Sequence, residues 1–343
     1  MNRPLLACLI ALVLLVVLPH LGMGDYYINL FSQILIFALF AASVNLIVGY
    51  GGMISLGHAA YLGIAAYSCT WLVTHGYGQL TAALGALMLT TLVAAVFGML
   101  ALRATGLSFL MITLALGQIV WGLAYRWVAL TNGDNGMALP ARPAPFGISL
   151  NGATSFYYFA LLVFACAIFC IWRMVHSPFG AALKGARDQP RRMSMLGHDV
   201  WMIRWLAFIL SGFWAGVAGL LFIYYQKFVS PYALSLQQSA EVLLMTILGG
   251  AGTLSGPVVG AVIVTLVKNV ASSYVERWNA LLGLIFVVAV MFMPHGIVPG
   301  LVQWRRAATR RKAKAVGLVP PTAEPPRADT PRPAPDAKLE RSA

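Results

Sequence analysis

The chain has 343 residues, of which 60% are hydrophobic and only 10% are charged, and its formal net charge is +13. An ordinary soluble domain is about half apolar and a quarter charged, so water could not be the only solvent of this chain. The composition therefore excludes a typical soluble protein. The positive-inside bias of membrane proteins explains the excess of basic residues better than nucleic-acid binding does.

Long runs without charge predict membrane-spanning helices. No Asp, Glu, Lys or Arg occurs from Tyr26 to Leu102, and further charge-free runs follow later in the chain. A helix needs about 20 apolar residues to cross a hydrocarbon core of about 30 Å. These runs also lack the alternating pattern of lipid-facing strands. We therefore predict an all-α, polytopic membrane helical bundle of about ten transmembrane helices, some of them broken or short. The predicted spans are 5–22, 27–48, 56–74, 80–102, 106–129, 154–175, 204–226, 238–250, 257–275 and 279–298.

The charges between the spans predict the orientation. Leu5–Leu18 resembles the apolar part of a signal peptide, but no small-x-small cleavage motif follows it, so we interpret it as a retained span. With Arg3 inside, ten crossings place the loop His176–Ile203 and the tail from Arg305 in the cytoplasm, where basic residues gather. Both termini are then cytoplasmic, and the loop Thr131–Asn151, rich in Gly, Pro and Asn, is external and irregular.

Two regions follow from this division. Residues 1–302 form the transmembrane domain, and residues 303–343 form a basic, Pro-rich tail that cannot bury enough apolar area to fold. The basic cluster that opens the tail suits either anionic lipid headgroups or a topology signal.

Polar residues inside the spans are candidates for a transport pathway. A charge at membrane depth is costly and suggests function, which singles out Glu241; the alternative is a residue near the external end of a short span that reaches water or caps a helix. Lys268 is expected to extend outward to water. His58 and Asn45 could serve the pathway or make hydrogen bonds that pack helices together.

Two glycine-rich stretches form a weak internal repeat, because Gly51–Leu56 resembles Gly249–Leu254. Glycine can break a helix beside a transport pathway, or it can allow close packing of helices. The candidate pathway residues are Asn45, Ser55, His58, Glu241, Gly249, Gly250 and Thr253.

The long cytoplasmic loop is amphipathic. Leu183, Ala186 and Met193 could dock on a partner while the basic residues stay in water. No lysine in the chain follows a glycine, so the Gly-Lys pair of a Walker A phosphate loop does not occur. If transport is driven by ATP, the ATPase must therefore be another polypeptide. We also expect no catalytic residue, cofactor or metal ion in this chain.

Five ordered motifs resemble the permeases of the branched-chain amino acid ABC importer family. Ser177–His198 is similar to the loop on which their ATPases dock, and this resemblance assigns ATPase coupling to Phe179, Gly180, Leu183, Arg187, Asp188 and Gly197. The other matches are Gly51–His58 together with Asn45, Thr113–Gln118, Leu248–Leu254 and Pro294–Ile297.

The resemblance implies one permease subunit in the bacterial inner membrane. Its expected partners are a second homologous permease, two cytoplasmic ATP-binding subunits and a periplasmic substrate-binding protein, but no nucleic acid. The implied substrates are branched-chain or related small amino acids. Urea or short amides are the alternative, and an ion-coupled secondary transporter is a less favoured one.

Overall fold

The structure is a computed structural model that describes residues 15–16, 18–21, 24–140, 142–143 and 150–274, with short pieces at 283–284, 287, 291 and 296–300. All of these lie in the first of the chain's two units, residues 1–300. The predicted spans 5–22 and 279–298 lie largely outside the described residues, and the tail lies wholly outside them. The count of ten crossings and the domain boundary at 302 therefore stay predictions.

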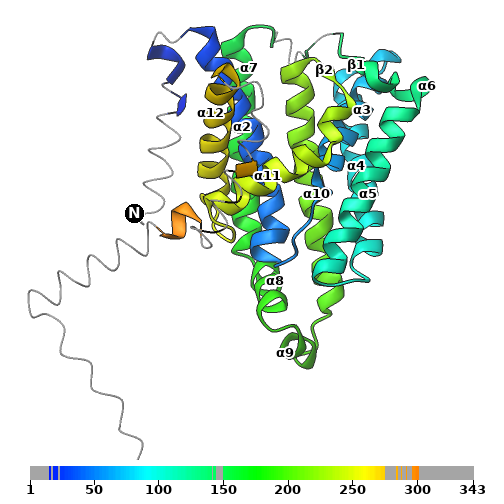
Figure 1. Cartoon of the computed structure of the whole chain (residues 1–343), viewed down its shortest axis with the longest axis vertical. Helices are drawn as coiled ribbons and strands as arrows, with labels where there is room; N and C mark the ends of the chain where they lie inside the picture. The colour runs from blue at the N-terminus through cyan, green and yellow to red at the C-terminus, as the bar shows by residue number, and fades with distance from the viewer. Residues whose placement is uncertain are drawn as a thin grey trace, which may run out of the picture. The chain divides into compact units, whose positions relative to one another are not determined.

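The described part is almost entirely helical, which confirms the predicted all-α membrane bundle (Figure 1). Five of the described helices are long and apolar enough to cross a membrane: α2 Asp25–Asn45 extended by the π-helix η2 Leu46–Tyr50, α4 Gln79–Ala101, α5 Leu107–Arg126, α7 Ala153–Val175 and α10 Val200–Gln226. The shorter helices α3 His58–Thr74, α11 Leu236–Gly249 and α12 Gly256–Tyr274 fill the remaining described spans. Each predicted span in these regions ends within a few residues of an observed helix end.

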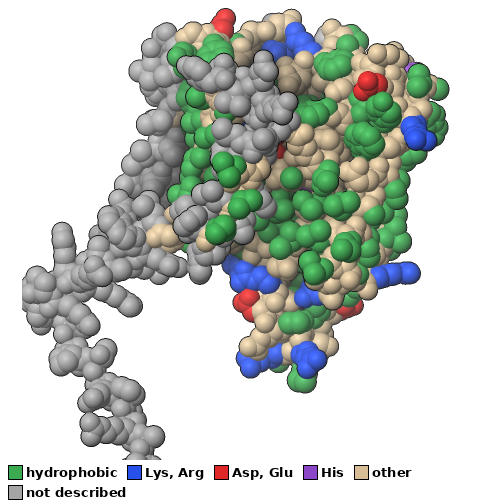
Figure 2. Space-filling model, viewed as in Figure 1, with side chains coloured by type: hydrophobic (Ala, Val, Ile, Leu, Met, Phe, Trp, Pro, Cys, Tyr) green, Lys and Arg blue, Asp and Glu red, His purple; other side chains and the backbone are tan. Residues whose placement is uncertain are grey.

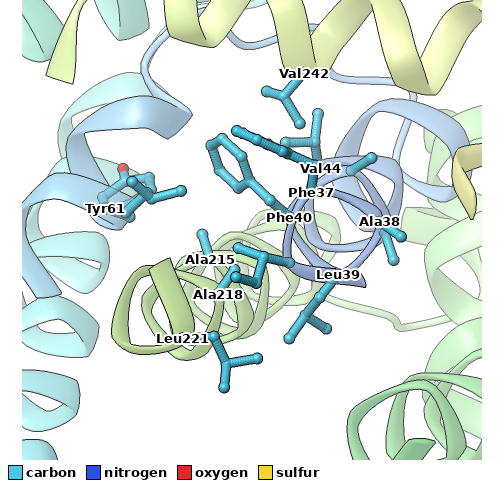
Figure 3. Packing of buried hydrophobic residues seen from close by; sticks show 14 of the residues in the cluster. Phe37, Ala38, Leu39, Phe40, Val44, Tyr61, Ala215, Ala218, Leu221 and Val242 are labelled. Atoms are coloured by element: carbon cyan, nitrogen blue, oxygen red, sulfur yellow. The ribbon is translucent and has the colours of Figure 1, made fainter. Parts of the chain in front are cut away.

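Burial separates a central helix from peripheral ones. The apolar window of α2 is 83% buried, whereas those of α4 and α5 are 22% buried. Helix α2 packs against α7, α10, α11 and α12, and α10 also packs against α3 and α4. Figure 3 shows Ala215, Ala218 and Leu221 of α10 beside the side chains of α2. The core therefore forms around α2 and α10, and α4 and α5 turn most of their surface outward.

A stripe of small residues brings α4 against α10. Every fourth residue of α4 is buried along this stripe, which consists of Ala82, Ala86, Thr90, Ala94 and Gly98. On the facing helix, a Cβ at Gly212 would collide with the Ala94 side chain, and one at Gly216 would lie 3.1 Å from Thr90 Cγ2. In lipid, helices associate through such close packing rather than through hydrophobic burial, so these small residues set the contact.

One end of the bundle is rich in basic side chains. Helices α8 Pro178–Asp188 and α9 Pro190–Met195 lie at the same end as the α4–α5 turn (Figure 1). Figure 2 shows Lys and Arg side chains gathered at this end and mostly hydrophobic side chains above it. The described charges at this end are Arg103, Arg173, Lys184, Arg187, Asp188, Arg191, Arg192, Asp199 and Arg204.

The starts of α8, α9 and α10 can be recognised in the sequence. Ser177 caps α8 by accepting from Gly180 N, with proline at the first turn. Pro190 then separates α9 from α8, because proline disfavours helical backbone at the residue before it. Asp199 caps α10 by accepting from Met202 N at 3.1 Å.

At the opposite end, the loop predicted to be irregular is more ordered than expected. It contains α6 Val128–Thr131, the 3-10 turn η3 Gly133–Asn135 and the strand β1 Met137–Ala138, which pairs antiparallel with β2 Phe228–Val229. Arg142 donates to the carbonyls of Tyr224 and Tyr225 at the end of α10. A cation at the negative end of a helix is favourable, so this contact anchors the loop. Two further 3-10 turns are η1 Leu18–Leu21 and η5 Pro231–Leu234.

Candidate functional site

Asn45 joins the two glycine-rich stretches. It lies at the point where α2 widens into η2, a π-helical turn of a kind that is frequent at functional sites. Its Nδ2 donates to the Thr253 carbonyl at 2.9 Å, and its Oδ1 accepts from Gly252 N at 2.8 Å. The backbone partners are one acceptor and one donor, so they fix the orientation of the amide. The second stretch of the weak internal repeat, Gly249–Leu254, is thus bound to the end of α2, which lies just before the first stretch.

The contact between the end of α2 and Gly252 requires glycine, because the two backbones leave no space for a side chain. A Cβ at Gly49 would collide with Asn45 Oδ1 and with the backbone of Gly252. Gly252 itself has a φ of +82°, a conformation that residues with a Cβ rarely adopt. We call Gly49–Gly52 and Gly249–Thr253 the glycine segments from here on.

Arg187 reaches from α8 to the first glycine segment. Its Nη1 donates to the Gly49 carbonyl at 2.6 Å, while its Nε donates to Asp188 Oδ1 at 2.8 Å. The hydrogen bond from Arg187 lowers the pKa of the exposed Asp188 carboxyl. The guanidinium therefore connects α8 to the end of α2 and, through Gly49, to the residues that Asn45 holds.

Other residues of the predicted coupling loop face the bundle. Leu183 and Ala186 are buried, Phe179 is half-buried, and a Cβ at Gly180 would collide with the Val175 carbonyl. The structure thus places Leu183 inward, where it seats α8 on the bundle, instead of on an outward docking face. The large apolar side chains that α9 and its C-terminal end expose are Met195 and Leu196, at 86% and 69%.

Gly197 provides the predicted turn into α10. Its φ is +84°, and the amides of Gly197 and His198 donate back to the carbonyls of Ser194 and Met193. A Cβ here would meet open space, so the requirement for glycine is the backbone angle alone.

His58 lies at the centre of a buried hydrogen-bond network. Its Nδ1 is 3.0 Å from Ser55 Oγ, and its Nε2 is 2.9 Å from Ser211 Oγ. Ser211 Oγ donates to the Ser43 carbonyl at 2.6 Å, so its lone pair must accept from His58 Nε2–H, and Nδ1 then accepts from Ser55. This neutral tautomer ties α3 to α10 and α2. The rings of Tyr61 and Phe208 pack edge-on against the imidazole.

Glu241 is fully buried and paired. Both carboxylate oxygens accept from Lys268 Nζ, at 3.0 and 2.9 Å, so the ion pair joins α11 to α12. Of the two interpretations of Glu241, the structure excludes the one in which it reaches water. It also corrects the expectation for Lys268, which points inward to Glu241 instead of outward. Sequence reasoning missed the pair because the partners stand on different helices.

The second glycine segment is also the turn of the α11–α12 hairpin. A Cβ at Gly249 would collide with the Gly256 carbonyl, so the two helix backbones are in contact. Thr253 Oγ1 donates to the Gly250 carbonyl at 2.8 Å and accepts from Gly256 N at 3.1 Å, which caps the start of α12. Gly250 has a φ of +118° at the end of α11. The two helices of the hairpin are thus joined by a backbone contact at the turn and by the Glu241–Lys268 ion pair farther from it.

Comparison with known proteins gives a family match over most of the chain. Residues 26–293 match the family model described as branched-chain amino acid transport system, permease component. The protein LivM of a high-affinity branched-chain amino acid transport system is 28% identical over 79% of this chain and 70% of its own length in Salmonella typhimurium. LivM of Escherichia coli is 28% identical over 85% of this chain and 74% of its own length. The related permease LivH of Escherichia coli is 22% identical over half of this chain. No solved structure matches.

Proposed function

Since the chain belongs to the permease family of branched-chain amino acid transport systems, we propose that it is the membrane-spanning subunit of an ATP-binding-cassette importer for branched-chain or related small amino acids. The family match, the relatives named LivM and the apolar helices support this function. The chain itself is a transport component and not an enzyme.

The proposed assembly contains a second homologous permease, two cytoplasmic ATP-binding subunits and a periplasmic substrate-binding protein. The basic end of the bundle, which carries α8 and α9, is assigned to the cytoplasm by the positive-inside rule (Figure 2). This orientation in the bacterial inner membrane directs the exposed Met195 and Leu196 toward the ATPases. Both termini are then cytoplasmic if ten spans are present.

The Arg187–Gly49 hydrogen bond carries the proposal for coupling. Free energy passes between two sites only if a shared element with distinct arrangements connects them. Movement of an ATPase against α9 would shift α8. Helix α8 is held on the bundle by the buried side chain of Leu183 and by Arg204, which donates to the Ala186 carbonyl at 2.9 Å. The hydrogen bond would then move the glycine segments, where η2 and the turn of the α11–α12 hairpin meet.

Reconstitution with the expected partners tests the proposed function. The permease is purified in mild detergent with candidate ATP-binding subunits and placed in liposomes with a binding protein. We expect the ATPases to co-purify and labelled leucine uptake to need ATP hydrolysis, without any effect of a proton or sodium gradient. Uptake of urea or acetamide in preference to leucine would assign the alternative substrates. Gradient-driven uptake without ATPases would refute the proposal in favour of a secondary transporter.

A further inference from the structure

The ion pair between Glu241 and Lys268 is almost entirely buried in the bundle. The Glu241 side chain is completely buried, whereas 20% of the Lys268 side chain is exposed. The ammonium bonds both carboxylate oxygens almost equally. The carboxylate is therefore fixed in the bundle, and the lysine, on a flexible four-carbon stem, is the partner that can move.

Stability does not explain this pair. Removing two charges from water is costly for each ion, and well-packed apolar residues in their place are often as stable or more stable. In a membrane protein, ionisable residues at such depth usually serve substrate or ion transfer. A function that uses the charges themselves is the simpler explanation.

Two further polar groups lie next to the pair along the same helices. Gln238 stands one turn before Glu241 on α11, and Thr265 stands one turn before Lys268 on α12; residues three apart share a helix face. Gln238 is 4% exposed and Thr265 is fully buried. Neither Gln238 Nε2 nor Thr265 Oγ1 has a hydrogen-bond partner among the described residues. Buried polar groups in native proteins are nearly always bonded, so these two have capacity for a ligand.

The charges match the head group of an amino acid. A zwitterion carries an ammonium and a carboxylate on one carbon, and it can insert between Glu241 and Lys268 so that its ammonium meets the carboxylate and its carboxylate meets the lysine. The four charges then alternate, and none is left uncompensated. The amide of Gln238 and the hydroxyl of Thr265 can donate to the substrate carboxylate.

Apolar side chains stand beside the pair. The Phe37 ring of α2 has its centroid 5.8 Å from Lys268 Nζ, and Val264 of α12, one turn before Lys268, is buried. Figure 3 shows Val242, the neighbour of Glu241, directed from α11 toward Phe37 and Phe40. Such surroundings suit a branched aliphatic side chain.

We propose that the Glu241–Lys268 pair, with Gln238 and Thr265, is a transient binding site for the charged head group of a zwitterionic amino acid during its passage through the permease. This inference rests on the proposed function and adds to it a site inside the permease itself. In the absence of substrate the two residues neutralise each other. When substrate binds, its ammonium and carboxylate replace the contact between Lys268 and Glu241.

The test uses the full permease–ATPase complex without binding protein, so that only a site in the complex itself can respond. Its thermal unfolding is measured with L-leucine, with L-leucinamide, which lacks the carboxylate, and with 4-methylpentanoate, which lacks the ammonium. A ligand that binds only the folded state raises Tm, and the rise grows with the logarithm of the ligand concentration once that concentration exceeds Kd. We expect leucine alone to raise Tm. No response to leucine, or an equal response to all three compounds, would overturn the site.

A neutral double variant, Glu241→Gln with Lys268→Met, separates function from packing. It leaves no buried charge unpaired, so it should assemble with the ATPases, lose the leucine response and lose uptake by about tenfold or more, which is the effect of 1.4 kcal/mol. Thr70→Val, a buried polar substitution on α3 (Thr70 donates to the Ala66 carbonyl), should keep both. Wild-type uptake by the double variant would show that the ion pair serves only the structure, and it would refute the proposed binding site. Failure of the unmodified complex to assemble or to use ATP would instead refute the proposed function.

Discussion

Among single residues, Asn45 has the most specific predicted effect. Asn45→Leu keeps the side-chain size but removes both bonds to the second glycine segment, which leaves Gly252 N–H and the Thr253 carbonyl unpaired. Each buried unpaired group costs about 1–3 kcal/mol. We expect the purified protein to unfold at a Tm lower by roughly 4–10 °C and residues 250–254 to exchange amide hydrogens faster.

Asn151→Leu, at an exposed position just before α7, is the matched control for this change and should leave both measurements unaltered. Unchanged Tm and unchanged exchange in Asn45→Leu would show that the two Asn45 hydrogen bonds contribute nothing to the contact with the second glycine segment.

The His58 network predicts a non-additive effect. His58→Phe leaves Ser55 and Ser211 hydroxyls without the imidazole partner and should destabilise the protein by about 1–3 kcal/mol. Adding Ser55→Ala and Ser211→Ala removes those unpaired groups, so the triple variant should be more stable than His58→Phe alone. Thermal unfolding of the three proteins measures this. A triple variant less stable than the single one would mean that the serines have other essential roles.

These residues also show the limit of sequence reasoning at this scale. Asn45, His58 and Glu241 could each be selected because a polar group inside an apolar span needs a partner. Which partner it finds depends on the register of distant helices: Thr253 O lies 208 positions from Asn45, and Ser211 lies 153 positions from His58. Local patterns contain no information about that register, so Lys268 could be expected to point outward.

At the scale of helices, the α11–α12 hairpin depends on glycine at its backbone contact. A Cβ at Gly260 would collide with the Met245 carbonyl, so Gly260→Ala should force the helices apart and cost about 1–3 kcal/mol or more. Gly122→Ala on α5 is the control, because nothing lies within 4 Å of its Cβ position and alanine favours helix. It should leave Tm unchanged or raise it, whereas an equal effect of both changes would contradict the contact.

Helix α8 can transmit the movement of an ATPase to the glycine segments only if Arg187 connects the two. Arg187→Met removes the bond to Gly49 and should reduce uptake by about tenfold, while ATP hydrolysis continues without responding to loaded binding protein. Arg191→Met, exposed on α9 and also basic, controls for the loss of one topology-determining charge.

The double variant Arg187→Glu with Gly197→Val tests the loop more severely. A β-branched residue strains the φ of +84° at position 197, so we expect normal insertion but no uptake and poor co-purification of the ATPases. Near-normal uptake by this variant would exclude the loop as the input of force.

Helix positions were more predictable than the elements between them. Charge-free runs mark spans because a charge in lipid is costly, and this holds whatever the neighbouring helices are. The π-helix η2 and the β1–β2 pair were not predicted, because the first arises where α2 meets Gly252 and the second joins residues about 90 positions apart. Both depend on tertiary contacts.

For the whole molecule, the unequal burial of the helices fits lipid as the outer solvent. Helices α4 and α5 expose large apolar side chains along most of their length, such as Leu80, Met88 and Met111, whereas α2 is enclosed by other helices. The apolar surface between the two charged ends is the part of the described structure that a bilayer would cover (Figure 2).

The orientation across that bilayer gives the last prediction. In a variant without native cysteines, single cysteines replace Asn135 in η3, the exposed Ser194 in α9, and Ser342 in the tail. With the basic end inside, a membrane-impermeant thiol reagent added to intact spheroplasts should label only the cysteine at position 135. Permeabilised cells should allow labelling at all three positions, which controls for thiol reactivity. Labelling at position 194 from outside would show that the bundle has the opposite orientation to the one predicted. Labelling at 342 alongside 135 would instead mean that an odd number of spans follows α9, a number that the described helices, which end at Tyr274, do not fix.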